Sequence, residues 1–317
     1  MKRDMPTVSV IVPTRNRADL IAEALRSVRD QTYQDLEIVV VDNGSTDKTP
    51  DVVAGLADPR ILYHWQEDSG LPADSRNVGI RMSAGHYVAF LDSDDVWLPE
   101  KLERQVAYLE THPDCGLIFM NASIIGDHHR SGQTLLRKTP PSGRVFEALL
   151  WENFISTLTA MVPRRVLDKV GVFDLDPAIR RAEDYDLWLR IAHDYEVAYL
   201  PMVGGLYRFH GSNLFADPTD ADLLYLRVIE RAAARHGVSP RLVNRLASRH
   251  YARLAFKHMK QGRPEAFRAA LRDGWRRYPS PLHVALRCAH ALLGPRRLAA
   301  LVDRGRAAGL RPGGDHF

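Results

Sequence analysis

The stretch Val8-Ser9-Val10-Ile11-Val12-Pro13-Thr14 begins the pattern that decides the fold. Residues 8–12 are apolar and β-branched apart from Ser9, and this composition predicts a buried strand. A helical pattern follows at about 18–29, and a second apolar run predicts a strand at 36–41. The alternation then continues, with strands expected at 61–65, 87–91 and 117–120 and helices at 46–56 and 72–82. Strands that are apolar on both faces and separated by helices predict an α/β fold, a mostly parallel sheet sandwiched by helices.

Three of these predicted strands end in polar segments. The first ends in Pro13-Thr14-Arg15-Asn16-Arg17, the second in Asp42-Asn43-Gly44-Ser45 and the fourth in Asp92-Ser93-Asp94-Asp95. Ligands of open α/β sheets bind beyond the carboxyl ends of the strands. We therefore expect the three segments to lie together on one rim of the sheet and to form a binding site.

The segment Asp92-Ser93-Asp94-Asp95 places three carboxylates within four residues, and these repel one another unless a cation is present. Mg²⁺ and Mn²⁺ prefer oxygen ligands and bind through one or two carboxylates together with substrate phosphates. The alternative is a cap on the helix that follows, but one cap needs a single Asp close to that helix. The segment favours a site for a metal ion and a diphosphate.

Two further acidic positions carry open interpretations. Asp42 ends a strand, where a carboxylate can accept hydrogen bonds from a ribose or a base. Ser45, Thr46 or Asp47 can cap the next helix, and a structural role is therefore expected for Asp47. Glu183 and Asp184 begin a predicted helix and could merely interact with its dipole. Beside a metal-diphosphate site, Asp184 could instead remove the proton from an attacking hydroxyl group.

The rear of the chain differs in composition and charge. From about residue 217 it is rich in Ala, Arg and Leu at helical spacing, and residues 221–317 carry 20 Lys and Arg against 6 Asp and Glu, a balance of +14. We expect two domains, one over 1–216 and a basic helical one over 217–317. The basic segment could be an inert helical cap, or it could contact an anionic membrane surface together with the apolar patch at 284–293. No nucleic-acid module accompanies it, and we expect no nucleic-acid partner.

Several classes of protein are excluded. Composition that is 45% hydrophobic and 26% charged is that of a globular protein, and two cysteines cannot make a disulfide framework. Apolar runs are too short for a membrane span or a signal-peptide core, so we expect a cytoplasmic location. The loop after the first strand has no glycine, which argues against a dinucleotide oxidoreductase and a nucleotidyltransferase, and no P-loop motif is present for an ATPase.

A set of motifs occurs in a characteristic order: VSVIVPT (8–14), VDNGSTD (41–47), SRNVGI (75–80), LDSDD (91–95), AEDYD (182–186) and YRFHGSN (207–213). Together they resemble the family 2 glycosyltransferases with the GT-A fold, over about residues 6–215. The resemblance implies inverting transfer of a sugar from a nucleotide-diphosphate sugar to a sugar or lipid-linked acceptor. It also implies Mn²⁺ or Mg²⁺, a role in cell-surface polysaccharide synthesis and peripheral contact with the inner face of the membrane. The alternative is a non-catalytic nucleotide-sugar-binding or scaffolding protein on the same fold.

The resemblance also assigns roles to residues that match the family's motifs. Asp184 would be the catalytic base, and Asp94 the main metal ligand with Asp92 beside it at the ribose or the metal. The other expected substrate-binding residues are Pro13 and Thr14 in the base pocket, Asp42 at the base or ribose, Arg76 along the nucleotide, Glu183 near a sugar, and Arg208 and His210 at the diphosphate, with the metal as the alternative for His210.

Overall fold

The computed structural model describes residues 6–127, 130–209 and 218–279. Three expectations concern residues outside these ranges: the role of His210, the boundary between the expected domains at 216/217, and the apolar patch at 284–293. The described residues form two compact units. The first holds the sheet and the helices around it, and the second holds residues 150–152 and the helices from residue 218 onward.

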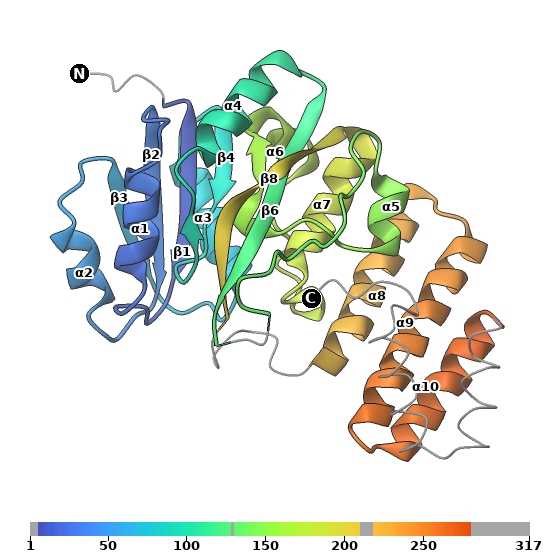
Figure 1. The fold of residues 1–317 in the computed structure, drawn as a ribbon. Coiled ribbons are helices and arrows are strands. Elements are labelled where there is room, and N and C mark those ends of the chain that lie inside the picture. The colour runs from blue at the N-terminus through green and yellow to red at the C-terminus, as the bar shows by residue number, and fades with distance from the viewer. Residues whose placement is uncertain (1–5, 128–129, 210–217, 280–317) are drawn as a thin grey trace. The chain divides into compact units, whose positions relative to one another are not determined.

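The first unit is built on one mixed sheet with the strand order β3-β2-β1-β4-β7-β6-β8-β5 (Figure 1). The strands are β1 (Val8–Thr14), β2 (Leu36–Asn43), β3 (Ile61–Gln66), β4 (Tyr87–Phe90), β5 (Val96–Trp97), β6 (Cys115–Gly126), β7 (Met161–Pro163) and β8 (Glu196–Phe209). The pairings β3-β2, β2-β1, β1-β4 and β6-β8 are parallel, and the described pairings made by β7 and β5 are antiparallel. The α/β fold with a mostly parallel sheet is therefore confirmed.

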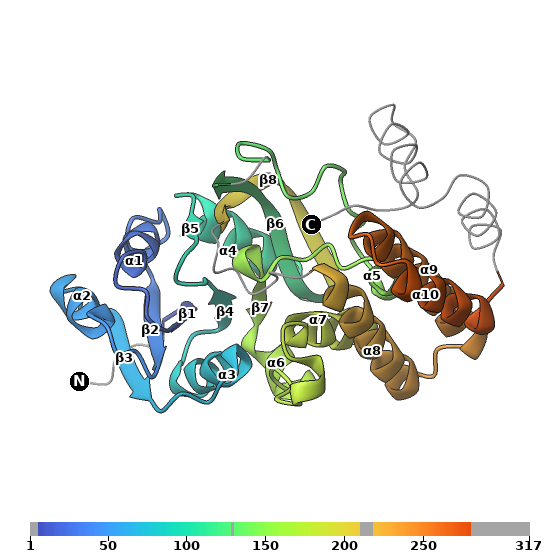
Figure 2. The same cartoon turned by 90° about the horizontal axis from the view of Figure 1, so that it is seen from below.

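Helices connect and cover the strands. They are α1 (Ile21–Arg29), α2 (Thr49–Gly55), α3 (Pro72–Met82), α4 (Lys101–Thr111), α5 (Phe146–Trp151), α6 (Arg164–Val170) and α7 (Glu183–Asp194), with the 3₁₀ turns η1 (Thr157–Thr159) and η2 (Pro177–Ile179). Seen from below, α1 and α4 lie on one face of the sheet and α3, α6 and α7 on the other (Figure 2). Apolar side chains of α1, α2 and α4 join one core cluster with alternate residues of β1 and β2, and this cluster buries one face of these strands. On the other face, Ile11 and Val41 lie against Gly79 of α3.

One close approach positions the front of α3. A Cβ atom added at Gly79 would lie 2.5 Å from Ile11 Cγ2 of β1, so only glycine lets α3 lie this close to the sheet. Arg76 lies one turn earlier on the same helix, and this packing holds it beside the ends of the strands.

The second unit contains α8 (Pro218–His236), α9 (Pro240–Lys260) and α10 (Pro264–Arg277). Leu254, Ala255 and Met259 of α9 pack with Phe267, Ala270 and Leu271 of α10 in a small apolar cluster. The expected helical character of this segment is confirmed for the residues described. No helix in the described part of the chain is long and apolar enough to cross a membrane.

Candidate active site

The polar segments after the parallel strands meet on one rim. The register of β1 and β2 places Thr14 opposite Asp42. The fourth strand runs parallel to β1, and the Leu91 amide donates to the Ile11 carbonyl just before Asp92. The expected rim is thus present, with the Pro13-Thr14, Asp42 and Asp92 segments at the carboxyl ends of neighbouring strands.

Asp42 is fully buried, and both of its carboxylate oxygens accept hydrogen bonds. The Ser45 amide donates to Oδ1 at 2.8 Å, and the Tyr63 hydroxyl donates to Oδ2 at 2.7 Å. Burial and the bond to this carboxylate raise the pKa of Tyr63. Asp42 therefore stabilises the turn at Asn43-Gly44-Ser45, in addition to any contact with a nucleotide that the resemblance implies. Asp47 accepts hydrogen bonds from the Ala18 and Thr49 amides and is therefore structural, although the N-cap residue of α2 is Lys48.

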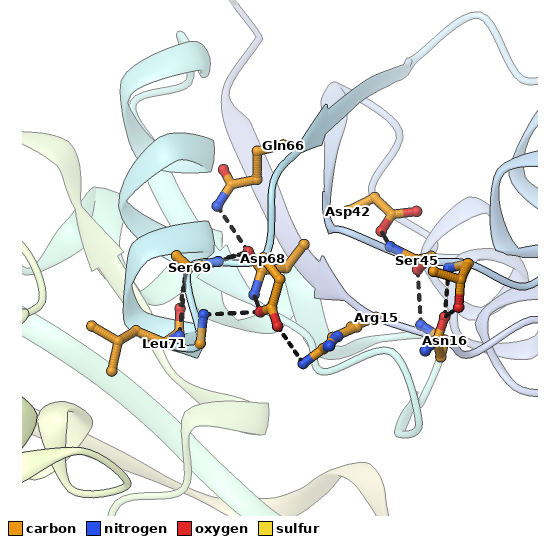
Figure 3. Close-up of polar contacts among 11 residues, drawn as sticks. Arg15, Asn16, Asp42, Ser45, Gln66, Asp68, Ser69 and Leu71 are labelled. Carbon is orange, nitrogen blue, oxygen red and sulfur yellow. Dashed lines mark hydrogen bonds and ion pairs between the residues drawn. The ribbon is translucent and has the colours of Figure 1, made fainter.

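A network of side chains joins the loops after β1, β2 and β3 (Figure 3). Arg15 forms an ion pair with Asp68 at 2.7 Å, and the Asn16 amide donates to Ser45 Oγ at 2.8 Å. Asn43 Nδ2 donates to Asp68 Oδ1 at 2.9 Å. The sequence motifs did not identify Asp68, because its segment contains no recognisable motif. The residues that contact Asp68 come from other loops and are brought to it by the fold.

Buried polar atoms at this rim lack partners. Thr14 Oγ1, Ser75 Oγ and Arg76 Nε are buried and make no hydrogen bond within the described structure. A buried polar group without a partner costs about 1–3 kcal/mol, so such atoms are rare unless water or a ligand completes them. Two of the three belong to Thr14 and Arg76, which are predicted nucleotide contacts.

Arg76 links the rim to the start of α7. Its side chain is 9% exposed, and its Nη2 lies 2.7 Å from Asp92 Oδ1 while its Nη1 lies 3.3 Å from Glu183 Oε1. Its guanidinium also lies over the Phe173 ring, 5.6 Å from the centroid. Burial alone would lower the pKa of Arg76, but the charges of Asp92 and Glu183 outweigh it and raise the pKa. Arg76 thus brings the predicted metal site and the predicted base, which lie far apart in sequence, into one cluster.

The other two acids of the Asp92–Asp95 segment have different surroundings. The Asp94 carboxylate lies 3.7 Å from Arg17 Nη2, and its side chain is 19% exposed. Asp95 is 2% exposed and accepts a hydrogen bond from the Arg208 amide at 2.7 Å. Burial and the nearby charges of Asp94 and Asp92 raise the pKa of Asp95 well above its usual value. Asp95 therefore links the acidic segment to the backbone of β8.

Arg208 braces the same segment. Its Nε donates to the Asp94 carbonyl at 2.9 Å, and its Nη2 pairs with Glu23 of α1 at 2.7 Å. These contacts hold the Asp94 backbone in place. Direct contact of Arg208 with a diphosphate stays a prediction.

The donor set fits a hard divalent cation only with help from a substrate. Within the described residues no group of three or more His, Cys, Asp or Glu side chains could hold a metal. The side chains of Asp92 and Asp94 are 35% and 19% exposed, and a pair of carboxylates completed by phosphate oxygens and water is how Mg²⁺ and Mn²⁺ are usually bound.

Glu183 and Asp184 are separated by their environments. Glu183 is 5% exposed, with Oε1 near Arg76 and Oε2 accepting from the Arg181 amide. Asp184 is partly exposed, with Oδ2 accepting from Thr157 Oγ1 at 2.9 Å and Oδ1 from the Tyr185 amide at 2.7 Å. Desolvation and the neighbouring charge of Glu183 raise the pKa of Asp184 to about 6. Of the two, Asp184 is the accessible carboxylate with a pKa suited to a base near neutral pH.

Known families and proteins are similar to this chain in sequence. The family model described as Glycosyl transferase family 2 matches residues 9–171. The putative teichuronic acid biosynthesis glycosyltransferase TuaG of Bacillus subtilis is 31% identical over 61% of this chain and 75% of that protein. The Escherichia coli UDP-Glc:alpha-D-GlcNAc-diphosphoundecaprenol beta-1,3-glucosyltransferase WfaP is 29% identical over 67% of this chain and 81% of that protein. A Rickettsia conorii glycosyltransferase is 32% identical, but this chain covers only 34% of its length.

Solved structures share the fold at low sequence identity. Staphylococcus aureus TarS in complex with UDP-GlcNAc superimposes with a TM-score of 0.64 at 19% identity, over 98% of this chain and 94% of that chain. The mannosyltransferase PcManGT from Pyrobaculum calidifontis, in complex with GDP-Man and Mn²⁺, gives a TM-score of 0.61 at 22% identity over 97% and 87%.

Proposed function

The chain belongs to glycosyl transferase family 2, and we propose that it transfers a sugar, with inversion, from a nucleotide-diphosphate sugar to an acceptor hydroxyl group. The observation that carries this proposal is the cluster in which Arg76 joins Asp92 to Glu183, next to Asp184. A displacement at a sugar carbon needs a leaving-group site and a base on opposite sides of the sugar. The Asp92–Asp94 rim and Asp184 supply candidates for both.

In this mechanism Asp184 takes the proton of the acceptor hydroxyl as that oxygen attacks the anomeric carbon. A carboxylate with a pKa near 6 is ionised at neutral pH and is still basic enough to accept a proton in the transition state. Asp92 and Asp94 would hold Mn²⁺ or Mg²⁺, which would neutralise the charge of the departing diphosphate. Thr14, Asp42 and the other predicted contacts would orient the nucleotide.

Binding of donor and metal can be tested by thermal shift. Nucleotide diphosphates and nucleotide sugars are screened with and without Mn²⁺, and a ligand at ~100 times its dissociation constant should stabilise the protein by about 2.7 kcal/mol. Asp94→Asn should lose the part of the shift that depends on Mn²⁺, whereas Asp51→Asn, at an exposed position of α2, should keep it. Absence of any shift with every nucleotide would favour the non-catalytic scaffold.

Turnover tests the base. Asp184→Asn keeps the shape of the side chain but removes the group that accepts the proton, so turnover should fall at least ~10²-fold while donor binding persists. Near-normal turnover in this variant would overturn the assignment. The scaffold alternative is less favoured because Asp42, Asp92, Asp94 and Asp184 are all retained.

The relatives and the composition of the second unit support proposals for the acceptor and for the place of action. WfaP is named for an acceptor linked to diphosphoundecaprenol, and we propose a lipid-linked acceptor here as well, in polysaccharide synthesis at the inner face of the membrane. We further propose that residues 1–216 form the catalytic domain and 217–317 a basic domain that contacts anionic lipid. Arg268, Arg272 and Arg276 follow one another at four-residue spacing and are exposed on α10.

Flotation with vesicles tests this membrane contact. The full chain should float with vesicles that contain anionic phospholipid, and the triple change of Arg268, Arg272 and Arg276 to Glu should abolish flotation. Failure of the unaltered chain to bind at low salt would refute membrane contact without touching the proposal of sugar transfer.

A further inference from the structure

The 3₁₀ turn η1 (Thr157–Thr159) was not singled out by any motif, yet it is fixed from several sides. Trp97 Nε1 donates to the Leu158 carbonyl at 2.8 Å, and Gln105 Nε2 donates to the Thr159 carbonyl at 2.7 Å. Thr159 Oγ1 donates to the Met120 carbonyl at 2.7 Å. Backbone carbonyls held by buried side chains cannot shift without breaking bonds, so the turn is a rigid platform.

Two of its anchors come from β5 and α4, the elements that directly follow the acidic segment. Trp97 belongs to β5, two residues after Asp95, and is 2% exposed. Lys101 Nζ lies 3.8 Å from the centroid of the Trp97 ring and donates to Gln105 Oε1 at 2.8 Å. The rigid turn therefore connects the predicted metal segment with the side chains that η1 contacts.

η1 contacts the predicted base, Asp184. Thr157 is 8% exposed, and its hydroxyl donates to Asp184 Oδ2 at 2.9 Å. The other oxygen of Asp184 accepts from the Tyr185 amide, a bond made within the start of α7 itself. Of these two bonds, only the one from Thr157 reaches Asp184 from a different element, and it fixes the rotation of the carboxylate.

We propose that Thr157 is a positioning residue for Asp184, and that it holds the carboxylate in the orientation and ionisation state needed to accept the acceptor's proton. This inference rests on the proposed function. A hydroxyl that donates to a carboxylate stabilises its ionised form. Glu183, adjacent on α7, opposes ionisation of Asp184 through its charge, and Arg76 of α3 favours it, so Thr157 acts within a balance of charges.

The test compares Thr157→Val with Thr157→Ser. Valine keeps the shape of the side chain but removes the donor, whereas serine keeps the donor. With Thr157→Val we expect the acid limb of the kcat–pH profile to move up by about one pH unit, because an ionised carboxylate loses a hydrogen bond. On the plateau above that limb, kcat should fall about 10-fold with little change in the KM for the donor. Thr157→Ser should restore most of both.

Thr159→Val serves as the matched control, since it removes a hydroxyl from the same turn that binds a carbonyl instead of Asp184. It should lower the thermal midpoint but leave the acid limb where it is. An unmoved limb in Thr157→Val, or equal losses in Thr157→Val and Thr157→Ser, would overturn the inference. Failure of the proposed function looks different, because Asp184→Asn would then retain turnover whatever Thr157 does.

Discussion

Replacing Arg76 by Met should destabilise the first unit strongly. The side chains of Arg76 and Glu183 are 9% and 6% exposed, so the change leaves a carboxylate buried without its cation. Removing one partner of a buried ion pair costs about 3–5 kcal/mol. Asp92 is 35% exposed and water screens its share, so we place the loss near the low end, at about 3 kcal/mol. For a unit of this size that corresponds to a thermal midpoint about 6–12 °C lower.

Urea unfolding at pH 7, followed by circular dichroism, measures this loss. Arg104→Met is the matched control, because Arg104 pairs with Glu100 at 2.8 Å but both side chains are more than half exposed. Its replacement should leave the urea midpoint nearly unchanged. Adding Glu183→Gln to Arg76→Met should recover part of the loss, since the uncompensated charge is gone. Equal losses for Arg76→Met and Arg104→Met, or no recovery in the double variant, would refute this reasoning.

Three other outcomes are expected. Gly79→Ala should destabilise by about 1–2 kcal/mol in urea unfolding because its Cβ meets Ile11. Gly55→Ala in α2, where a Cβ meets nothing within 4 Å, should stabilise by about 0.5–1 kcal/mol. A stabilising effect of Gly79→Ala would contradict the close packing of α3 on β1. The pKa of Asp184 is raised to about 6, so its protonation stabilises the folded state, and this stabilisation is lost as pH rises through 6. In thermal unfolding at pH 8, Asp184→Asn should therefore be about 1–2 kcal/mol more stable than the parent. A less stable variant would count against the raised pKa. Burial lowers the pKa of Lys101 well below 10.5, so the unfolded chain binds the extra proton and the stability of the fold should rise with pH towards 10.5. In Lys101→Met the urea midpoint should depend less on pH between pH 7 and 10. An unchanged pH dependence would show that Lys101 stays charged.

Much of the fold was predictable because its signals are local. The helix at Pro72–Met82 has the predicted bounds, and β1 and β2 extend the predicted strands by two residues each. β8 runs from Glu196 to Phe209, far beyond the short apolar stretch at 197–200 near its start. Its second half alternates less clearly in hydrophobicity, and its pairing with β6 shifts register, so no simple period marks it.

For the candidate site, too, some features were predictable from the sequence and others were not. Motif order was enough to select Asp92, Asp94, Glu183, Asp184 and Arg76, because their chemistry is written in residue type and in position after a strand or before a helix. Their mutual arrangement was not predictable. Arg76 bridges Asp92 and Glu183, and Arg208 holds the Asp94 backbone. The contacts Arg76–Glu183 and Arg208–Asp94 each join residues that are more than a hundred positions apart in the sequence.

By itself the sequence determined the family, the alternation of strands and helices, and the rim on which the acidic residues lie, since these follow from hydrophobic period and local spacing. The tertiary structure alone decided which carboxylates are buried and which are accessible. Asp42 and Asp95 are enclosed while Asp94 and Asp184 remain partly open, and Thr157 meets Asp184 across the fold. The physical reason is that desolvation and charge pairing depend on what packs around a side chain, and those neighbours come from distant parts of the chain.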